Sequence, residues 1–479
     1  MAPPRCTAPP PPPPPIARET VKAATHKGRL LHRSLANPPH MVASALGSTL
    51  HLANGRTVID ACGGAAVAII GHGNQEVLDA VVAQAQKVSY VHTQSYSTPV
   101  AEELADLVLD GKPHGLEKAL FLGSGSEVTE AALKLARQYH FERNEARRVH
   151  LVSRKQSYHG NTMASMSVSH NLARKRPYEG FEYPHVSHVT PPYAYRYKLD
   201  GETDGQFTAR LLRELEGEFL RVGPETVVAF ICEPIIGATA GCVVPPAGYL
   251  AGVRSICDKY GILLILDEVM CGTGRTGTFF AFEQEHVVPD IVTVAKGLGG
   301  GYAAIAALYV HGRIIDTLRQ GSQAVIHGHT YQAHPVSCAA ALAVQKILKR
   351  GGLVERCRDM GVVLERLLRR ELAECRSVGD IRGRGLFWAV EFVKDAVTKE
   401  CFDPLIGFGA KVTQICLEKG VAVYPGSGTV DGLKGDHVLL APPYTVTEEE
   451  LVTVCRTLRE SILSQEARYL YARANSSSP

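Results

Sequence analysis

Short runs of consecutive apolar residues recur through the middle of the chain, and each run stops at a glycine or a polar residue. A continuous apolar run, unlike an alternating one, is typical of a parallel strand that is covered on both faces of its sheet. Segments with helical periodicity separate the runs, as at 127–139, 211–220 and 248–260. The pattern predicts a large α/β domain with a mostly parallel, mixed sheet at residues 71–335. The apolar runs are Lys118–Leu122, Val149–Val152, Val227–Cys232, Ile262–Leu266 and Ile291–Val294.

Helical segments alternate with single strand-like segments after residue 335. A half-buried strand is expected at Leu386–Val393 and another strand at Val421–Tyr424. The last helix, 447–463, begins with a start signal, Thr447-Glu448-Glu449-Glu450. These segments predict a smaller α+β domain at 336–466, joined by strand-like pieces of an N-terminal segment at 21–70. The proline-rich residues 1–20 and the residues 467–479 are expected to be disordered tails. Two further helices are expected before the first strand of the large domain, at Gln75–Lys87 and Pro99–Val108.

The composition is that of a globular protein and argues against several classes of function. Of the 479 residues, 45% are apolar and 21% are charged, and the net charge is +3. The densest basic run, Arg174-Lys175-Arg176, is too short for a surface that binds nucleic acid. The twelve cysteines form no C-x-x-C pair, which favours free thiols in a reducing compartment over disulfides or a bound metal. There is no apolar stretch of membrane-spanning length and no signal or transit peptide pattern, so we expect a cytoplasmic protein without a membrane partner.

Polar residues follow the predicted strands at one end, the carboxyl end. Ligands bind at that edge in open α/β sheets, so these side chains should converge on one crevice. Lys296 follows the apolar run 291–294 and is itself followed by glycines. An isolated lysine in such a place is usually a surface residue, whereas an amine held in a dry crevice can form a Schiff base.

A glycine-rich turn, Gly123-Ser124-Gly125-Ser126, joins the first predicted strand to a helix. The free N–H groups and the positive dipole end of a helix N-terminus suit a phosphate group, although the turn could also be an ordinary strand-to-helix connection. Val128 stands where a dinucleotide fingerprint needs its third glycine, so NAD is disfavoured while a single phosphate is possible. Lys296 does not belong to a P-loop, because it lacks the preceding glycine spacing and a following Ser or Thr.

Asp267 and Tyr158 complete the candidate site. An acid that ends an apolar run is costly to bury without a partner. Asp267 therefore either caps the next turn or pairs with a protonated ring nitrogen, which is what pyridoxal phosphate (PLP) requires of its protein. Tyr158 either packs in a wall or offers an aromatic face to a ring. A lysine, an aspartate, a phosphate-binding turn and an aromatic side chain together fit a PLP site.

Six blocks of sequence carry a resemblance to a known family. They read G-S-G-S-E-V-T-E-A-A-L-K-L-A-R, S-Y-H-G-N-T, E-P-I-I-G-A, L-L-I-L-D-E-V-M-C-G-T-G-R-T-G, A-K-G-L-G-G-G-Y and H-G-H-T-Y-Q-A-H-P. From about Leu50 to Leu463 the chain resembles the class III (subgroup II) aminotransferases, which have PLP fold type I. The spacing from Asp267 to Lys296 is also that of the family.

The resemblance implies roles for the residues around the cofactor ring. Lys296 is expected to be the catalytic lysine, which forms the Schiff base with PLP and moves the proton between substrate and cofactor. Asp267 is expected to pair with the ring nitrogen. Val269 is expected under the ring and Tyr158 above it.

The resemblance also implies contacts farther from the ring. Gly125 and Ser126 are expected to bind the phosphate, and Thr330 to reach the phosphate from the neighbouring subunit. The active unit would then be at least a homodimer, or a dimer of dimers. Arg382, within Ile381-Arg382-Gly383-Arg384-Gly385, is expected to hold a substrate carboxylate through two hydrogen bonds.

Two positions depart from some relatives and resemble the amine/ω-amino-acid:pyruvate branch. Ala238 replaces a glutamate that masks the arginine, and Met270 replaces a glutamine near the cofactor hydroxyl. The resemblance thus implies ping-pong transamination from an amine or (ω-)amino acid to an oxo acid such as pyruvate. Aminomutases, epimerases and a decarboxylase of the family share the same residues, so these reactions stay open. A non-catalytic scaffold is disfavoured because Lys296 and Asp267 are both present, and the sequence does not identify the amino donor.

Overall fold

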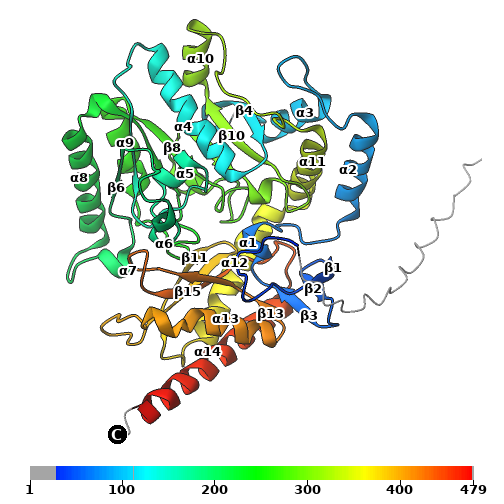
Figure 1. The fold of residues 1–479 in the computed structure, drawn as a ribbon, viewed down its shortest axis with the longest axis vertical. Helices are drawn as coiled ribbons and strands as arrows, with labels where there is room; N and C mark the ends of the chain where they lie inside the picture. Colours follow the sequence, from blue (N-terminus) through cyan, green and yellow to red (C-terminus); the bar gives the residue numbers. More distant parts are fainter. Residues whose placement is uncertain (1–28, 112, 477–479) are drawn as a thin grey trace, which may run out of the picture.

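A seven-stranded sheet forms the centre of the large domain (Figure 1). The computed structural model describes residues 29–111 and 113–476. The strand order is β4-β10-β9-β8-β7-β5-β6, and only β10 is antiparallel to its neighbours in this sheet. Because β4 and β9 are both antiparallel to β10, they run in the same direction, and the carboxyl ends of all strands but β10 meet at one edge. The strands are β4 (Leu116–Leu122), β5 (His150–Arg154), β6 (Val186–Val189), β7 (Val227–Cys232), β8 (Leu263–Asp267), β9 (Ile291–Val294) and β10 (Ala306–His311).

Helices cover both faces of this sheet, as the continuous apolar runs predicted. Along β8, Leu264 and Leu266 pack into a core with α8 and α9, whereas Leu263 and Ile265 pack into a second core with α4 and α10. Apolar side chains are therefore needed at consecutive positions of the strand. The helices of the large domain are α4 (Gly125–Glu142), α5 (Met163–Val168), α8 (Asp204–Val222), α9 (Tyr249–Tyr260) and α10 (Gly312–Gln320), with the short helices α1 (Gly63–Ala66), α6 (Leu172–Lys175) and α7 (Ala194–Tyr197) in connections.

Two helices precede the sheet, and a third helix joins the two domains. α2 (Gln75–Lys87) and α3 (Pro99–Val108) have the bounds that the sequence predicted, and the Asn74 side chain caps α2 by accepting a hydrogen bond from the Val77 N–H. Both helices pack against α11 (Pro335–Arg350). Along α11, Leu342 enters a core of the large domain and Val344 enters the core of the small domain. The boundary that we placed between residues 335 and 336 thus lies at the start of a helix that contacts both domains.

The small domain contains an antiparallel sheet of order β11-β12-β15-β14 and the helices α12, α13 and α14 (Figure 1). All six residues of β12 are buried, although the sequence predicted a half-buried strand. The reason is that Trp388 and Val390 face the helices of the small domain, while Phe387 and Ala389 pack in a cluster with Ile235 of the large domain. The elements are β11 (Val378–Arg384), β12 (Phe387–Phe392), β14 (Tyr424–Ser427), β15 (Asp436–Leu440), α12 (Leu353–Glu371), α13 (Phe408–Glu418) and α14 (Glu448–Ser476).

A second small sheet ties the N-terminal segment to the small domain. Its order is β1-β2-β3-β13, and β13 pairs in parallel with β3. The segment expected as one strand at Val421–Tyr424 is therefore divided, because β13 belongs to this sheet and Tyr424 begins β14 of the other. The strands are β1 (Val42–Leu46), β2 (Thr49–Leu52), β3 (Thr57–Asp60) and β13 (Val421–Ala422).

The last helix begins where the start signal predicted. The Thr447 N–H donates to Glu450 Oε2 at 2.8 Å, and the Glu450 N–H donates to Thr447 Oγ1 at 3.2 Å, which together form a capping box. The helix then continues to Ser476, so residues 467–476 do not form the disordered tail that we expected. The proline-rich residues 1–20 and the end at 477–479 lie outside the described residues.

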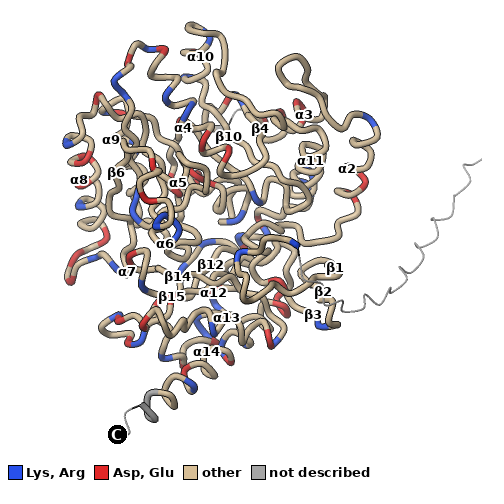
Figure 2. Tube along the Cα trace, viewed as in Figure 1, with Lys and Arg blue, Asp and Glu red and all other residues tan. Residues whose placement is uncertain are grey.

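Charged side chains of both signs alternate along the chain trace, as on α8 (Figure 2). No helix within the described ranges is long and apolar enough to cross a membrane. Across residues 29–111 and 113–476, no group of three or more His, Cys, Asp and Glu side chains has a metal-binding arrangement.

Candidate active site

A cavity of about 330 Å³ lies at the carboxyl edge of the large sheet, where the sequence predicted a crevice. The turns after β4, β5, β8 and β9 each contribute to it, so segments far apart in the sequence meet there. The cavity contains six of the predicted site residues and neither Thr330 nor Arg382. The lining residues are Val67, Gly123, Ser124, Gly125, Ser126, Tyr158, His159, Gly160, Asp267, Val269, Ala295, Lys296, Ala303, Ala304 and Ile305.

Lys296 extends its amine into this cavity from a strained backbone position. Its φ angle is +43°, a left-handed conformation that is uncommon for a residue with a side chain and that is concentrated at functional sites. The Nζ atom donates a hydrogen bond to the carbonyl oxygen of Ala65 at 2.9 Å. Burial lowers the pKa of the Lys296 amine from 10.5 to about 8, against the opposing effect of the Asp267 carboxylate and with a smaller lowering by the Arg275 cation. The amine is therefore partly neutral near physiological pH.

Asp267 is a buried carboxylate that is held from two sides. Its Oδ2 atom accepts a hydrogen bond from His159 Nδ1 at 2.7 Å, and its Oδ1 atom accepts one from the Val269 N–H at 3.0 Å. His159 is itself buried, and its Nε2 atom has no partner in the described part of the chain. No role was predicted for His159 from the sequence, although it stands next to Tyr158 in the block S-Y-H-G-N-T. The two hydrogen bonds orient the carboxylate, while each oxygen keeps a lone pair for a further donor.

The turn between β4 and α4 provides the N-terminus of a long helix. The Ser124 side chain caps α4 by accepting from the Glu127 N–H at 3.2 Å. The part of the cavity next to the N-terminus of α4, called the corner below, is kept open by glycines. A Cβ atom on Gly125 would lie 3.2 Å from Val269 Cγ1, and a Cβ atom on Gly160 would lie 2.6 Å from Ser126 Oγ. Gly160 also has a φ angle of +136°, which side chains rarely adopt. The corner thus presents helix N–H groups to a small space, as phosphate binding requires.

Glu233 fixes the turn that carries Tyr158. This buried carboxylate accepts hydrogen bonds from the Tyr158 N–H at 3.3 Å and from the Gly237 N–H at 3.0 Å. Burial raises the pKa of Glu233, and the electrostatic effect of the neighbouring His159 opposes this rise. Glu233 stands in the E-P-I-I-G-A block, and each of its two carboxylate oxygens accepts one of these backbone hydrogen bonds.

Thr330 lies outside the Lys296 cavity in the single chain. It is exposed and lines an adjoining cavity of about 550 Å³, which shares Gly123, Ala304 and Ile305 with the Lys296 cavity. A contact between Thr330 and the phosphate of another subunit stays a prediction.

Arg382 is engaged by the protein itself. Its Nε atom donates to the Gly241 carbonyl at 2.6 Å, one terminal nitrogen donates to Asp380 at 2.8 Å and Glu391 at 2.7 Å, and the other donates to the Ala240 carbonyl at 2.5 Å. These four bonds leave one of the five N–H groups of the guanidinium, whereas a two-point grip on a carboxylate needs two. In this conformation Arg382 connects β11 to the large domain, and the substrate role that the resemblance implied stays a prediction.

The residues of the cavity fit PLP. The Lys296 amine can meet its aldehyde, the Asp267 carboxylate its ring nitrogen, and the N–H groups at Gly125 and Ser126 its phosphate. Tyr158 and Val269 supply the aromatic and apolar contacts for a ring. The open corner at Gly125 and the lone pairs left on the Asp267 oxygens are the features of this structure that favour the fit.

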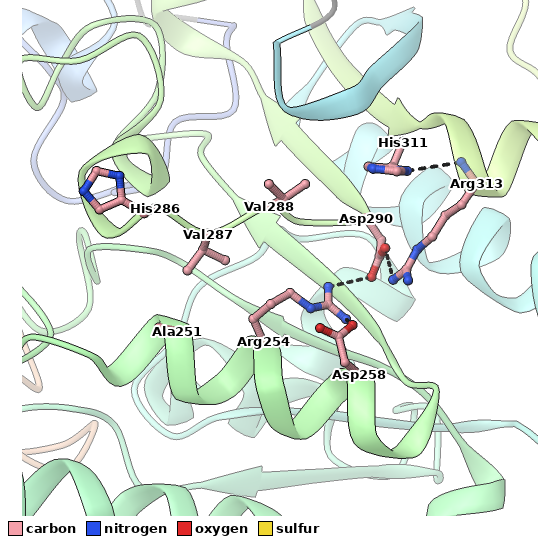
Figure 3. A pocket seen from close by; sticks show the side chains of 9 residues that line it. All are labelled: Ala251, Arg254, Asp258, His286, Val287, Val288, Asp290, His311 and Arg313. Atoms are coloured by element: carbon pink, nitrogen blue, oxygen red, sulfur yellow. Dashed lines mark hydrogen bonds and ion pairs between the residues drawn. The ribbon is translucent and has the colours of Figure 1, made fainter.

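A second hollow lies on the surface of the large domain, away from these residues (Figure 3). Its volume is about 420 Å³, and it shares no lining residue with the Lys296 cavity. Its charges are neutralised within the hollow, because Arg254 pairs with Asp290 at 2.9 Å and with Asp258 at 2.7 Å, and Arg313 also pairs with Asp290. The charged side chains that line this hollow therefore form structural ion pairs with one another.

The chain is similar to aminotransferases over nearly its whole length. A family model described as aminotransferase class-III matches residues 31–462. A protein of Schizosaccharomyces pombe, named as an uncharacterized aminotransferase, is 48% identical over 441 residues, which cover 92% of this chain and 96% of that protein. Gamma aminobutyrate transaminase 2 of Solanum lycopersicum is 32% identical, covering 90% of this chain and 93% of its own length.

The fold agrees with that of a solved amine transaminase. The structure of an enzyme from an uncultivated Pseudomonas species, in its PLP-bound form, matches with a TM-score of 0.86 at 31% identity and covers 91% of this chain and 99% of that one. Together with the Lys296 cavity, these matches show that the chain belongs to the class III aminotransferase family and is a PLP-dependent enzyme of fold type I.

Proposed function

We propose that this aminotransferase moves an amino group from an amine or an ω-amino acid to an oxo acid such as pyruvate, in a ping-pong reaction. The observation that carries the proposal is the Lys296 amine, whose pKa is about 8, in one cavity with the buried Asp267 carboxylate. PLP, when bound, supplies an electron-accepting ring that makes the C–H bond beside the amino group acidic. The neutral Lys296 Nζ can take that proton and return it. Asp267, oriented by His159, can hold the proton of the ring nitrogen.

The surroundings of Ala238 and Met270 support an amino donor whose other end is uncharged, or carries a charge far from the reacting amino group. Both residues pack against an apolar cluster that contains Cys271 and Leu439, with Tyr424 beside it. The name of the tomato relative, a gamma aminobutyrate transaminase, is a further argument for an ω-amino acid as donor.

We also propose that the active enzyme is a homodimer or a dimer of dimers. The segment around Thr330 exposes large apolar side chains, with Ile326 at 68% and Tyr331 at 67% exposure. Neighbouring exposed apolar residues of this size are typical of a surface that another protein covers. A second copy of the chain on this surface would bring Thr330 of the partner subunit toward the Gly123 end of the cavity.

The cysteines support a reducing compartment such as the cytoplasm. Every cysteine of the described residues is free, and all but Cys401 are buried. Free buried thiols are common in reducing compartments, whereas disulfides mark oxidising ones. We therefore keep the cytoplasm as the proposed location.

The reaction type can be tested on the purified, PLP-loaded enzyme with a panel of amines and ω-amino acids and no oxo acid. The proposal predicts that a substrate removes the yellow absorbance and yields one equivalent of its carbonyl product per site, and that pyruvate restores the absorbance. A donor that is turned over many times without loss of absorbance would contradict transamination and would indicate an aminomutase, an epimerase or a decarboxylase. The Lys296→Ala variant serves as the control, because it should bind PLP and yet yield no carbonyl product.

A further inference from the structure

An arginine next to the active-site cavity has no protein partner for its charge. Arg174, on α6, lies with its guanidinium carbon 5.1 Å from the centre of the Tyr158 ring. Its guanidinium makes no hydrogen bond or ion pair within residues 29–111 and 113–476, and its backbone N–H donates to the carbonyl and side-chain oxygens of Asn171. The side chain is exposed, so its charge is open to an anion from solution. A guanidinium that rests on an aromatic face keeps its planar fork free for a carboxylate.

α6 lies between the large domain and the small domain (Figure 1). Leu172 of this helix touches the connection between β14 and β15, where a Cβ atom on Gly432 would lie 3.3 Å from Leu172 Cγ. Tyr158, on which Arg174 rests, lines the cavity together with Lys296. The Arg174 charge also contributes to lowering the pKa of Lys296, which agrees with its place near the amine.

The other cations nearby are engaged or point to protein groups. Lys175 pairs with Glu182 at 2.9 Å and donates to backbone carbonyls. Arg382 makes four hydrogen bonds to protein atoms, two of them to carboxylates. Arg275 is buried, and one of its terminal nitrogens donates to two backbone carbonyls. Its Nε and its other terminal nitrogen have no partner in the described residues, but burial closes them off from solvent. Arg174 is therefore a cation beside Tyr158 whose whole N–H fork is free of protein partners in the described part of the chain.

We propose that Arg174 binds the carboxylate of the oxo-acid acceptor, and the distal carboxylate of an ω-amino acid donor, while Arg382 joins the two domains. The inference rests on the proposed transaminase function and names the substrate class of that site as short carboxylates. A carboxylate can take two parallel hydrogen bonds from the guanidinium, which is the geometry that distinguishes Arg from Lys. An amine donor without a carboxylate makes no use of this contact.

The experiment compares the PLP-loaded wild type with R174M, R174K and the matched control R176M. Arg176 is an exposed arginine of the same segment and has no aromatic ring beneath it in the described structure. Calorimetry measures the Kd of propionate, a carboxylate that has no ketone or aldehyde group and so cannot accept an amino group. Kinetics measure the ratio of kcat/KM for pyruvate to kcat/KM for butanal, an acceptor without a carboxylate.

R174M should raise the Kd of propionate and lower the pyruvate-to-butanal ratio by about 10- to 100-fold, as the loss of a hydrogen-bonded charge pair predicts. R174K should fall between R174M and the wild type, and R176M should stay within about twofold of the wild type. Wild-type affinity for propionate in R174M, or an equal loss in R176M, would overturn the proposal. The propionate measurement needs no turnover, so it decides the role of Arg174 even if the enzyme transaminates no tested amine, a result that would refute the proposed function instead.

Discussion

The ionisation of Lys296 follows from the burial of its amine in the active-site cavity. With a pKa of about 8, roughly a quarter of the amines are neutral at pH 7.5, whereas an ordinary lysine with a pKa of 10.5 is about 0.1% neutral. The reactive fraction is thus on the order of 250-fold larger than at a surface lysine. Because folding lowers this pKa, the folded protein binds fewer protons between pH 8 and 10.5, and the contribution of Lys296 to stability rises with pH in that window.

The perturbation that tests this reasoning is Asp267→Asn. The Asp267 carboxylate raises the pKa of the Lys296 amine and so opposes the effect of burial. Replacing this carboxylate with a neutral amide should therefore lower the pKa of Lys296 below 8. Asp258→Asn is a suitable control, because Asp258 is a carboxylate of the separate surface hollow.

The assay is competitive labelling of the PLP-free protein with acetic anhydride between pH 6 and 11, read by mass spectrometry of the peptide that contains Lys296. The exposed Lys411 serves as the internal reference for reagent reactivity. We expect half-maximal labelling of Lys296 near pH 8 in the wild type and in Asp258→Asn, and at a lower pH in Asp267→Asn. A wild-type midpoint at pH 10 or above would refute the account of a dry, desolvated amine.

Three further variants test the geometry of the site. Gly160→Ala should weaken PLP binding at least about 10-fold, because its Cβ atom would lie 2.6 Å from a hydroxyl oxygen at a φ angle of +136°; equilibrium binding measures this, and unchanged affinity would contradict the open corner. His159→Phe removes the 2.7 Å hydrogen bond to Asp267 and should lower kcat by about 10- to 100-fold with little change in KM for the amine, whereas a change in KM alone would argue against orientation of the carboxylate. If Thr330 acts across a dimer, mixing refolded Lys296→Ala and Thr330→Ala subunits should restore up to about a quarter of wild-type sites, since half of the random dimers carry one intact site; no recovery in such mixed dimers would place Thr330 in its own subunit's site or in none.

The parts of the fold that could be predicted are those set by local pattern. The helices at 75–87 and 99–108 have their predicted bounds, because apolar periodicity and the capping residue Asn74 are local signals. The strand ends meet at one edge of the sheet because the strands are parallel. This arrangement alone was enough to predict that Lys296, Asp267 and Tyr158 lie in one cavity.

Features that depend on distant partners could not be predicted. The burial of β12 depends on the large domain on its second face, and Glu391 within it is neutralised by Arg196 and Arg382 from separate segments. The division at Val423 depends on two different sheets that take β13 and β14 as edge strands. His159 gave no separate signal because a histidine beside Tyr158 acquires its role only from the Asp267 carboxylate, which lies 108 residues farther along the chain.

The most direct test of the central claim is to reduce the PLP-loaded enzyme with borohydride and to map the modified lysine by peptide mass spectrometry. The account predicts one phosphopyridoxyl group per chain, on the peptide that contains Lys296, and none at this site in Lys296→Ala. A label on a different lysine, or loss of the cofactor without any label, would contradict the account.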